Sequence, residues 1–136
     1  MQIQPYLFFN GRCDEAIALY QDALGAQTSQ LMRYKDSPEP APPGMLPAGF
    51  ADKVMHASLD IGGATLMLSD GDSADGPQFN GFFVSLTLGD EADARRKFDA
   101  LAAAGQVVMP MGKTFWSPCF GMVQDRFGLG WMIMVA

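Results

Sequence analysis

The sequence predicts an α+β fold made of two tandem modules, each with the order strand, helix, strand, strand, strand. Two observations lead to this prediction. Apolar segments of strand length and segments of helical period occur in the same order in both halves of the chain. Hydrophobic residues make up 49% of the 136 residues and charged residues 18%, which suits a packed core. We expect one domain over residues 1–136, with modules of about residues 1–72 and 80–136.

The first half begins with an apolar segment, residues 4–9, that Asn10-Gly11 ends, so we expect a short buried strand. A helix follows and ends at Gly25; its apolar face is formed by Ala16, Ile17, Tyr20, Ala23 and Leu24. Residues 27–34 form the next predicted strand. Residues 54–70 alternate around Gly62-Gly63, which predicts two antiparallel strands joined by a hairpin.

The segment between these strands, residues 35–53, holds five of the nine prolines. Proline lacks a backbone N–H and interrupts both helices and central strands, so we expect a long surface loop. Such loops serve as lids or dimer contacts, and plain mobility is the alternative.

The second half repeats the order of the first. Residues 82–88 form an apolar strand, and Asp90 is placed to cap a helix that buries Ala94 and Phe98 and ends at Gly105. Residues 106–111, 114–124 and 129–135 supply three further strands. Each half alone has too little core, so the two halves must pack together, within one chain or swapped between two.

Charge and composition exclude several classes of partner. The formal net charge of -6 repels phosphate backbones and anionic membranes, so we expect no nucleic acid partner. No apolar segment approaches the roughly 18 residues of a membrane span, and the first residues do not have the pattern of a signal peptide. Two cysteines, Cys13 and Cys119, are too few for a disulfide scaffold, so we expect a cytoplasmic protein.

Several motifs resemble the PhnB-like branch of the glyoxalase/bleomycin resistance protein/dioxygenase (vicinal oxygen chelate) superfamily. The first is Pro5-Tyr6-Leu7-Phe8-Phe9-Asn10-Gly11. The others are Glu15-Ala16-Ile17 with Tyr20, Leu31-Met32-Arg33-Tyr34, Met55-His56-Ala57, Leu66-Met67-Leu68-Ser69-Asp70, Thr114-Phe115-Trp116, Phe120-Gly121-Met122, and Phe127-Gly128 before Trp131-Met132.

This resemblance implies that the paired modules form a cupped, eight-stranded, mostly antiparallel sheet around a cavity, with the helices outside, in a homodimer. It also carries the name demethylubiquinone methyltransferase-like domain. Methyltransferases that use S-adenosylmethionine carry a glycine-rich turn after the first strand of a parallel sheet. No such turn occurs in this sequence, so we do not infer that activity.

Metal-dependent relatives hold an ion with four side chains from the first and fourth strands of each half. Alignment of the motifs places Pro5, Met67, Phe83 and Met132 at these positions. Proline and phenylalanine offer no lone pair, and a thioether is a poor ligand for hard divalent ions. We therefore expect neither a metal nor another cofactor at the family position.

The remaining candidate residues have both a functional and a structural interpretation. His56, the only histidine, is a general base or a lone ligand, or else a polar residue at a strand start that is bonded to the backbone. Cys119 could be a nucleophile with His56 as its base, but a buried core thiol is the simpler reading, as it is for Cys13. Arg33 could bind an anionic group of a ligand or form a salt bridge. Trp116 could stack on a flat ligand, or else pack at the edge of the sheet or at a dimer contact.

Strand alternation indicates an apolar cavity lined with soft side chains and hydroxyls. We expect the cavity to bind a small apolar or aromatic molecule. The alternative is that side chains fill it. The predicted pocket residues are Phe9, His56, Met67, Phe83, Ser85, Trp116 and Met132. The expected function is therefore that of a metal-free, homodimeric small-molecule-binding protein. The alternatives are a metal-dependent lyase, isomerase or dioxygenase that uses a displaced site containing His56, and a drug-sequestering resistance protein.

Overall fold

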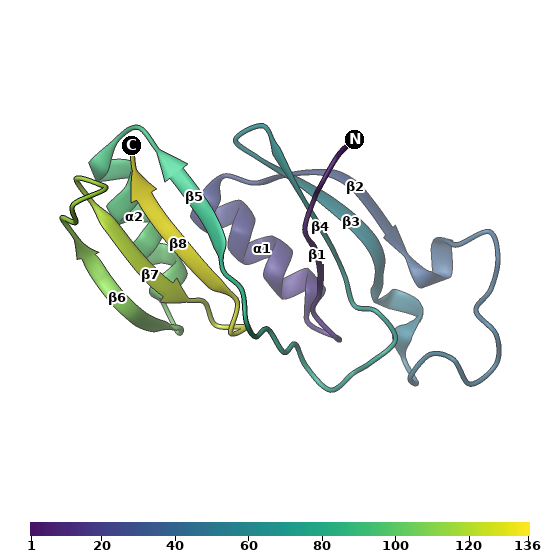
Figure 1. Ribbon diagram of the computed structural model, residues 1–136. Helices are drawn as coiled ribbons and strands as arrows, with labels where there is room; N and C mark the ends of the chain where they lie inside the picture. Colours follow the sequence, from purple (N-terminus) through teal and green to yellow (C-terminus); the bar gives the residue numbers. More distant parts are fainter. The chain divides into compact units, whose positions relative to one another are not determined.

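The computed structural model describes residues 1–136, which form two compact units, Met1–Pro77 and Gln78–Ala136 (Figure 1). Each unit contains one α-helix of 12 residues and its own four-stranded sheet. The predicted α+β fold of two strand-helix-strand-strand-strand modules is confirmed. No helix is long and apolar enough to cross a membrane.

The first unit comprises β1 (Tyr6–Phe8), α1 (Cys13–Leu24), β2 (Gln27–Arg33), β3 (Val54–Ile61) and β4 (Ala64–Ser69). Its strand order is β1-β4-β3-β2, and we call it sheet A. β1 runs parallel to β4, whereas β4 with β3 and β3 with β2 are antiparallel. The proline-rich segment lies between β2 and β3, as predicted, and is bounded by 3₁₀ turns at Tyr34–Asp36 and Phe50–Asp52.

The second unit comprises β5 (Val84–Leu88), α2 (Glu91–Ala102), β6 (Gln106–Gly112), β7 (Phe120–Gln124) and β8 (Gly130–Val135). Its order, β5-β8-β7-β6, repeats that of sheet A, and we call it sheet B. The first strand is again parallel to the fourth, and the other pairs are antiparallel.

One carboxylate organises the start of α1. Arg12 precedes the helix but makes no side-chain cap. The buried Asp70, just after β4, takes over this task by accepting hydrogen bonds from the backbone N–H of Gly11 and of Cys13, both at 2.8 Å. Its other oxygen accepts from the N–H of Val54 at 2.9 Å. Asp70 therefore ties β3 and β4 to the helix N-terminus, where a negative charge is favourable.

The helix α2 begins and ends in a different way. Asp90 caps it as predicted, since its carboxylate accepts from the N–H of Asp93 at 2.9 Å. After the helix, Ala104 adopts a left-handed conformation with φ of 60°. This conformation is unfavourable for a residue that has a Cβ atom. The neighbouring Gly105 has no room for a side chain, because its Cβ would lie 2.2 Å from the carbonyl oxygen of Gln124.

One predicted strand is too long. Residues 114–124 were expected to be continuous, but β7 begins only at Phe120. The hydroxyl of Thr114 accepts from the N–H of Ser117 at 3.1 Å, and the N–H of Thr114 donates to the Ser117 carbonyl at 3.0 Å. This local turn uses backbone groups that a strand would pair across the sheet.

Candidate functional site

The two faces of sheet A differ in what covers them. The side chains of Leu7, Leu59 and Leu68 are buried on the face that packs against α1, which we call the helix face. The opposite face, which we call the open face of sheet A, carries a different set. Strand pairing places six side chains on this face, and most of them are at least partly exposed: Tyr6, Phe8, Met32, His56, Ser58 and Met67.

A chain of three polar groups crosses the open face of sheet A. The hydroxyl of Tyr6 lies 3.3 Å from Nδ1 of His56, and the hydroxyl of Ser58 lies 3.3 Å from Nε2 of the same ring. A neutral imidazole has one N–H donor and one acceptor, so one hydroxyl donates to the ring and the other accepts from it. Such a chain can offer a ligand a hydrogen bond and can move a proton along its length.

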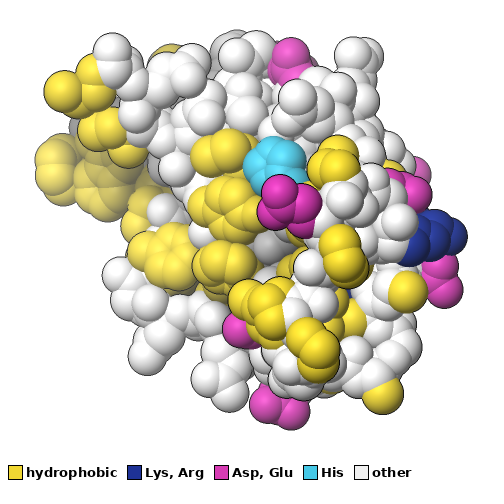
Figure 2. Space-filling view, turned by 90° about the vertical axis from the view of Figure 1, so that its right-hand side faces the viewer, with side chains coloured by type: hydrophobic (Ala, Val, Ile, Leu, Met, Phe, Trp, Pro, Cys, Tyr) yellow, Lys and Arg dark blue, Asp and Glu magenta, His cyan; other side chains and the backbone are white.

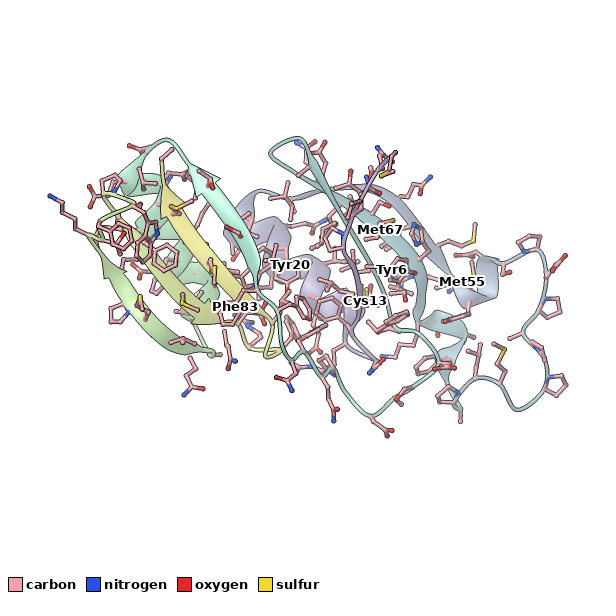
Figure 3. The ribbon with its side chains drawn as sticks, in the orientation of Figure 1. Tyr6, Cys13, Tyr20, Met55, Met67 and Phe83 are labelled. Atoms are coloured by element: carbon pink, nitrogen blue, oxygen red, sulfur yellow. The ribbon has the colours of Figure 1, made fainter.

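Aromatic rings surround this chain. The ring of Tyr6 lies 5.2 Å from that of Phe8 and 5.7 Å from that of His56, measured between centroids. Tyr6 is 39% exposed and Phe8 52%. In Figure 3, Tyr6 and Met67 lie close together on neighbouring strands, as their paired positions require. The open face therefore offers a flat molecule both a stacking surface and a polar group.

A hollow of about 510 Å³ adjoins this surface on the side of β2. It is lined by Gln30, Leu31, Met32, Met55 and His56. In the space-filling view, hydrophobic side chains lie on both sides of the only histidine, and an acidic side chain lies directly against it (Figure 2). The volume falls within the range of sites for small organic molecules.

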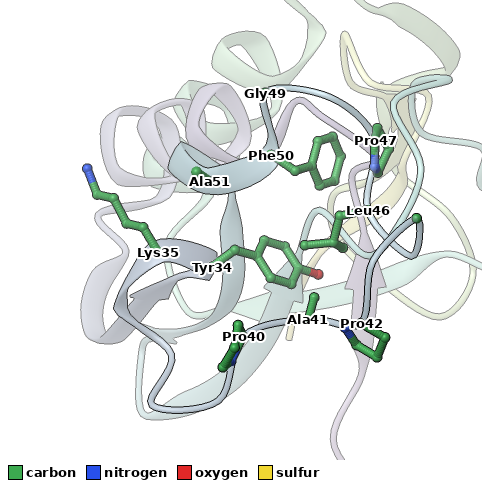
Figure 4. A pocket seen from close by; sticks show the side chains of 11 residues that line it. Tyr34, Lys35, Pro40, Ala41, Pro42, Leu46, Pro47, Gly49, Phe50 and Ala51 are labelled. Atoms are coloured by element: carbon green, nitrogen blue, oxygen red, sulfur yellow. The ribbon is translucent and has the colours of Figure 1, made fainter.

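The proline-rich segment encloses a second hollow, of about 340 Å³ (Figure 4). The rings of Tyr34 and Phe50, 6.0 Å apart, form part of its wall together with Leu46 and several prolines. The hydroxyl of Tyr34 donates to the carbonyl of Gly71. Burial raises the pKa of Tyr34, with smaller effects from Tyr6, Asp70 and Asp72. Sequence reasoning missed these residues, although five prolines between two aromatic residues were the available signal.

The open face of sheet B has a similar chemical character. Ser85 pairs with Met132, and Thr87 pairs with Met134, across β5 and β8. The ring of Phe83 covers Gly130, where a Cβ would lie 2.7 Å from it. The predicted residues Phe83, Ser85 and Met132 therefore belong to one apolar surface that also carries hydroxyls.

Trp116 lies in the turn before β7 and is 52% exposed. Its ring packs edge-on against Phe120 at 5.3 Å and against Phe115 at 4.7 Å. Because Phe120 pairs with Met134, Trp116 extends the open face of sheet B. Phe115 is almost entirely exposed, at 97%.

Two assignments on the first strand are wrong. Phe9 was expected to line the pocket together with Met67, and Pro5 was expected at a metal position beside Met67. The register instead pairs Tyr6 with Met67 and Leu7 with Leu68, so Leu7 lies on the helix face. Phe9 is fully buried and its ring packs against Tyr20 of α1 at 6.2 Å. By the same register, Tyr6 and not Pro5 stands beside Met67.

The positions at which the resemblance implies metal ligands do not fit a hard divalent ion. With the register corrected, β1 and β4 contribute a phenol and a thioether, from Tyr6 and Met67. The second unit contributes Met132 beside Ser85, with Phe83 two residues earlier. Nowhere in the protein do three His, Cys, Asp or Glu side chains gather as a metal site. Hard cations bind carboxylate oxygens and zinc binds imidazole or thiolate, and neither set is present.

The two cysteines and Arg33 have structural roles. Cys13 and Cys119 are both free and fully buried. Burial and, next, the carboxylate of Asp70 raise the pKa of Cys13 far above its usual value. Burial also raises the pKa of Cys119, so neither thiol has the properties of a nucleophile. Arg33 forms two hydrogen bonds of 2.9 Å with Asp14 and a third, of 2.7 Å, with the Asp52 carbonyl.

Comparison with known proteins agrees with the fold and the motifs. Residues 2–133 match the profile of the Glyoxalase/Bleomycin resistance protein/Dioxygenase superfamily. The chain is 38% identical over 143 residues to Protein YjdN of Escherichia coli K12, covering 99% of this chain and 95% of that protein.

Solved structures agree with the fold of this chain. The crystal structure of protein PA1353 from Pseudomonas aeruginosa is 42% identical, with a TM-score of 0.84 and coverage of 99% of this chain and 97% of that one. The PhnB protein of Bacillus cereus is 24% identical, with a TM-score of 0.79 and full coverage of both chains, and supports the fold. The resemblance to the superfamily is thus confirmed. The chain belongs to the glyoxalase/bleomycin resistance protein/dioxygenase superfamily.

Proposed function

We propose that this protein binds a small, mostly apolar or aromatic molecule on the open face of sheet A, without a hard divalent ion at the positions of the family metal site. The observation that carries the proposal is the surface formed by Tyr6, Phe8 and His56. Two exposed aromatic rings lie there beside a hydroxyl–imidazole–hydroxyl chain. Apolar walls with a few placed polar groups are the general character of small-molecule sites.

The side chains on the open face of sheet B support the same ligand chemistry. Four methionines, Met109, Met122, Met132 and Met134, lie on this face by cross-strand pairing with one another or with Phe120 and Thr87. Thioethers are flexible and polarisable, so they adapt to apolar ligands of different shapes.

The experiment is a screen of small aromatic compounds that carry one hydrogen-bonding group, followed by thermal melting and ligand-observed NMR. We expect compounds that raise the Tm, because binding to the folded state stabilises it. Phe8→Ala should weaken each such compound, and Tyr6→Phe should weaken those that use the phenol. The matched control is Phe115→Ala, which removes an even more exposed ring outside both sheets.

Two results would count against the proposal. One is a screen in which no compound binds. The other is binding that Phe115→Ala weakens as much as Phe8→Ala, because the ligand would then occupy exposed aromatic rings in general rather than the open face of sheet A.

We also propose that the protein acts as a homodimer in the cytoplasm. The edge strand β6 exposes Val107, Val108 and Met109 by 43% to 50%, and exposed apolar edge strands tend to pair or become covered. Both cysteines are free, which suits a reducing compartment. Light scattering coupled to size exclusion tests the dimer; a monomer at all concentrations would contradict it.

A further inference from the structure

The only histidine of the chain has methionines as neighbours. Met32 on β2 stands directly opposite His56 on β3 in the antiparallel pair. Residues in such positions have Cβ atoms about 5 Å apart and share one face of the sheet. The thioether of Met32 is therefore within reach of the imidazole of His56.

A second methionine joins this pair because the ladder is irregular. Met32 pairs with His56, but the next residue, Arg33, pairs with Val54, so Met55 has no partner on β2. A bulge of this kind redirects a side chain that regular alternation would place on the other face. Met55 and His56, although neighbours in sequence, both line the 510 Å³ hollow together with Met32.

We infer that Met32, Met55 and His56 form a binding site for a soft monovalent cation of the Cu(I) or Ag(I) class. Two thioethers and one imidazole are neutral, soft to intermediate donors, which select such ions over zinc, magnesium or calcium. Met32 is 38% exposed, so an ion can enter from solvent. The net charge of -6 favours the approach of a cation.

Binding requires the imidazole ring to turn. The strand order β1-β4-β3-β2 puts Tyr6 on one side of His56 and Met32 on the other. Nδ1 of His56 lies 3.3 Å from the Tyr6 hydroxyl, a long hydrogen bond that is readily given up. Rotation about the Cβ–Cγ bond directs Nδ1 toward Met32, and the ion replaces the phenol as its partner. Removal of that phenol should therefore strengthen binding.

The experiment follows the methionine methyl groups during titration with Ag(I) in chloride-free buffer. Silver is a redox-inert probe of the same class, and methyl labelling reports each methionine separately, so silver bound to a cysteine thiol does not mimic the result. At one equivalent we expect the methyl signals of Met32 and Met55 to shift. Met122, on the open face of sheet B, is the internal control and should not shift.

Variants test each ligand. Met32→Leu, Met55→Leu and His56→Ala should each weaken silver binding by at least about tenfold, since even outer-shell changes cost that much in metal sites. Leucine retains the volume of methionine, so the fold should be kept. Tyr6→Phe should strengthen binding a few fold. Met122→Leu, on the open face of sheet B, should have no effect.

Three outcomes would overturn the inference: no methyl signal shifts, the shifts fall on Met109, Met122 and Met132 instead, or His56→Ala binds as tightly as the original chain. The inference does not rest on the proposed function. The titration uses only the silver ion, so a failure to bind silver would not decide whether the protein binds aromatic compounds.

Discussion

At the scale of single residues, Asp70 connects three parts of the first unit. It is fully buried, and its two oxygens accept hydrogen bonds from three backbone N–H groups on the α1 N-terminus and on β3. The contacts with Cys13 and Val54 are buried, and the contact with Gly11 is partly buried. Asp70 also fixes the position of Gly11, in the segment that follows β1. The strand β1 itself carries the aromatic residues Tyr6 and Phe8.

Asp70→Ala should therefore be strongly destabilising. It leaves three backbone donors without their carboxylate, and we expect a loss of roughly 3 kcal/mol or more in the free energy of unfolding. Urea denaturation measures it. The matched control is Asp72→Ala, an exposed aspartate two residues away, which should change stability by less than about 0.5 kcal/mol. Equal effects of the two substitutions would show that Asp70 does not hold these segments.

Cys13 makes stability depend on pH in the alkaline range. Its pKa is raised in the folded protein by burial and then by Asp70, whereas an unfolded thiol titrates near about 8.5. The folded state therefore keeps the proton that the unfolded state loses. The contribution to stability is complete below about pH 8.5 and declines as the pH rises toward the folded pKa.

Urea midpoints between about pH 7 and pH 10 should accordingly fall for the original chain and fall less steeply for Cys13→Ala. Each thiol contributes a slope of at most about 1.4 kcal/mol per pH unit. Identical pH profiles would mean that the Cys13 thiol ionises freely in the folded protein.

The face on which each residue lies could be predicted only where a strand has a regular pattern. Met67 and Met132 alternate with buried residues, and Ser85 alternates with less exposed ones, on strands of five residues or more. β1 has only three residues, all apolar or aromatic, so no polar residue marks its phase. An error of one residue in the phase of a strand exchanges its two faces. For this reason Phe9 was assigned to the pocket face of the first strand, where Tyr6 lies instead. The Tyr6–His56 contact joins positions 50 residues apart, and no local pattern predicts it.

At the scale of elements, helix and strand ends decide local stability. α1 ends at Gly25 in the left-handed conformation, with φ of 67°, as its sequence predicts. The end of α2 differs, because the left-handed position belongs to Ala104 and not to the predicted Gly105. Gly105 is required instead because the carbonyl of Gln124 leaves no room for a Cβ. This contact joins residues far apart in the sequence, so the local pattern could not predict it. The turn at residues 114–117 was likewise missed, because its side-chain hydrogen bonds depend on geometry.

Two neighbouring substitutions should consequently have opposite effects. Ala104→Gly relieves a left-handed residue of its Cβ and should stabilise the protein by up to about 1 kcal/mol. Gly105→Ala places a methyl group against a backbone oxygen and should destabilise it by more than about 3 kcal/mol. Thermal and urea unfolding measure both, and the same sign for both variants would contradict this assignment of roles.

At the scale of the whole molecule, each unit has its own sheet and helix, and we propose that the two still form one cooperative domain over residues 1–136. Each unit alone is small for an independent core. Calorimetry should show one transition whose calorimetric enthalpy equals its van't Hoff enthalpy. Two resolved transitions would instead define two independently folding domains.

The central claim at this scale is the proposed binding of a small molecule without a hard divalent ion. The metal-free part of this proposal rests on the side chains at or beside the expected metal positions, which are Tyr6 and Met67 on sheet A and Phe83, Ser85 and Met132 in the second unit. None of them is a carboxylate, imidazole or thiolate, so zinc, nickel, manganese or iron(II) would find no ligand set that suits it.

The most direct test is metal analysis of the purified protein together with melting curves in the presence of added Zn, Ni, Mn and Fe. We predict no stoichiometric divalent metal and no change in Tm with any of the four ions, because none gains binding energy from the folded state. One equivalent of a divalent metal with a raised Tm would contradict the account and would point to a metal-dependent activity of the superfamily.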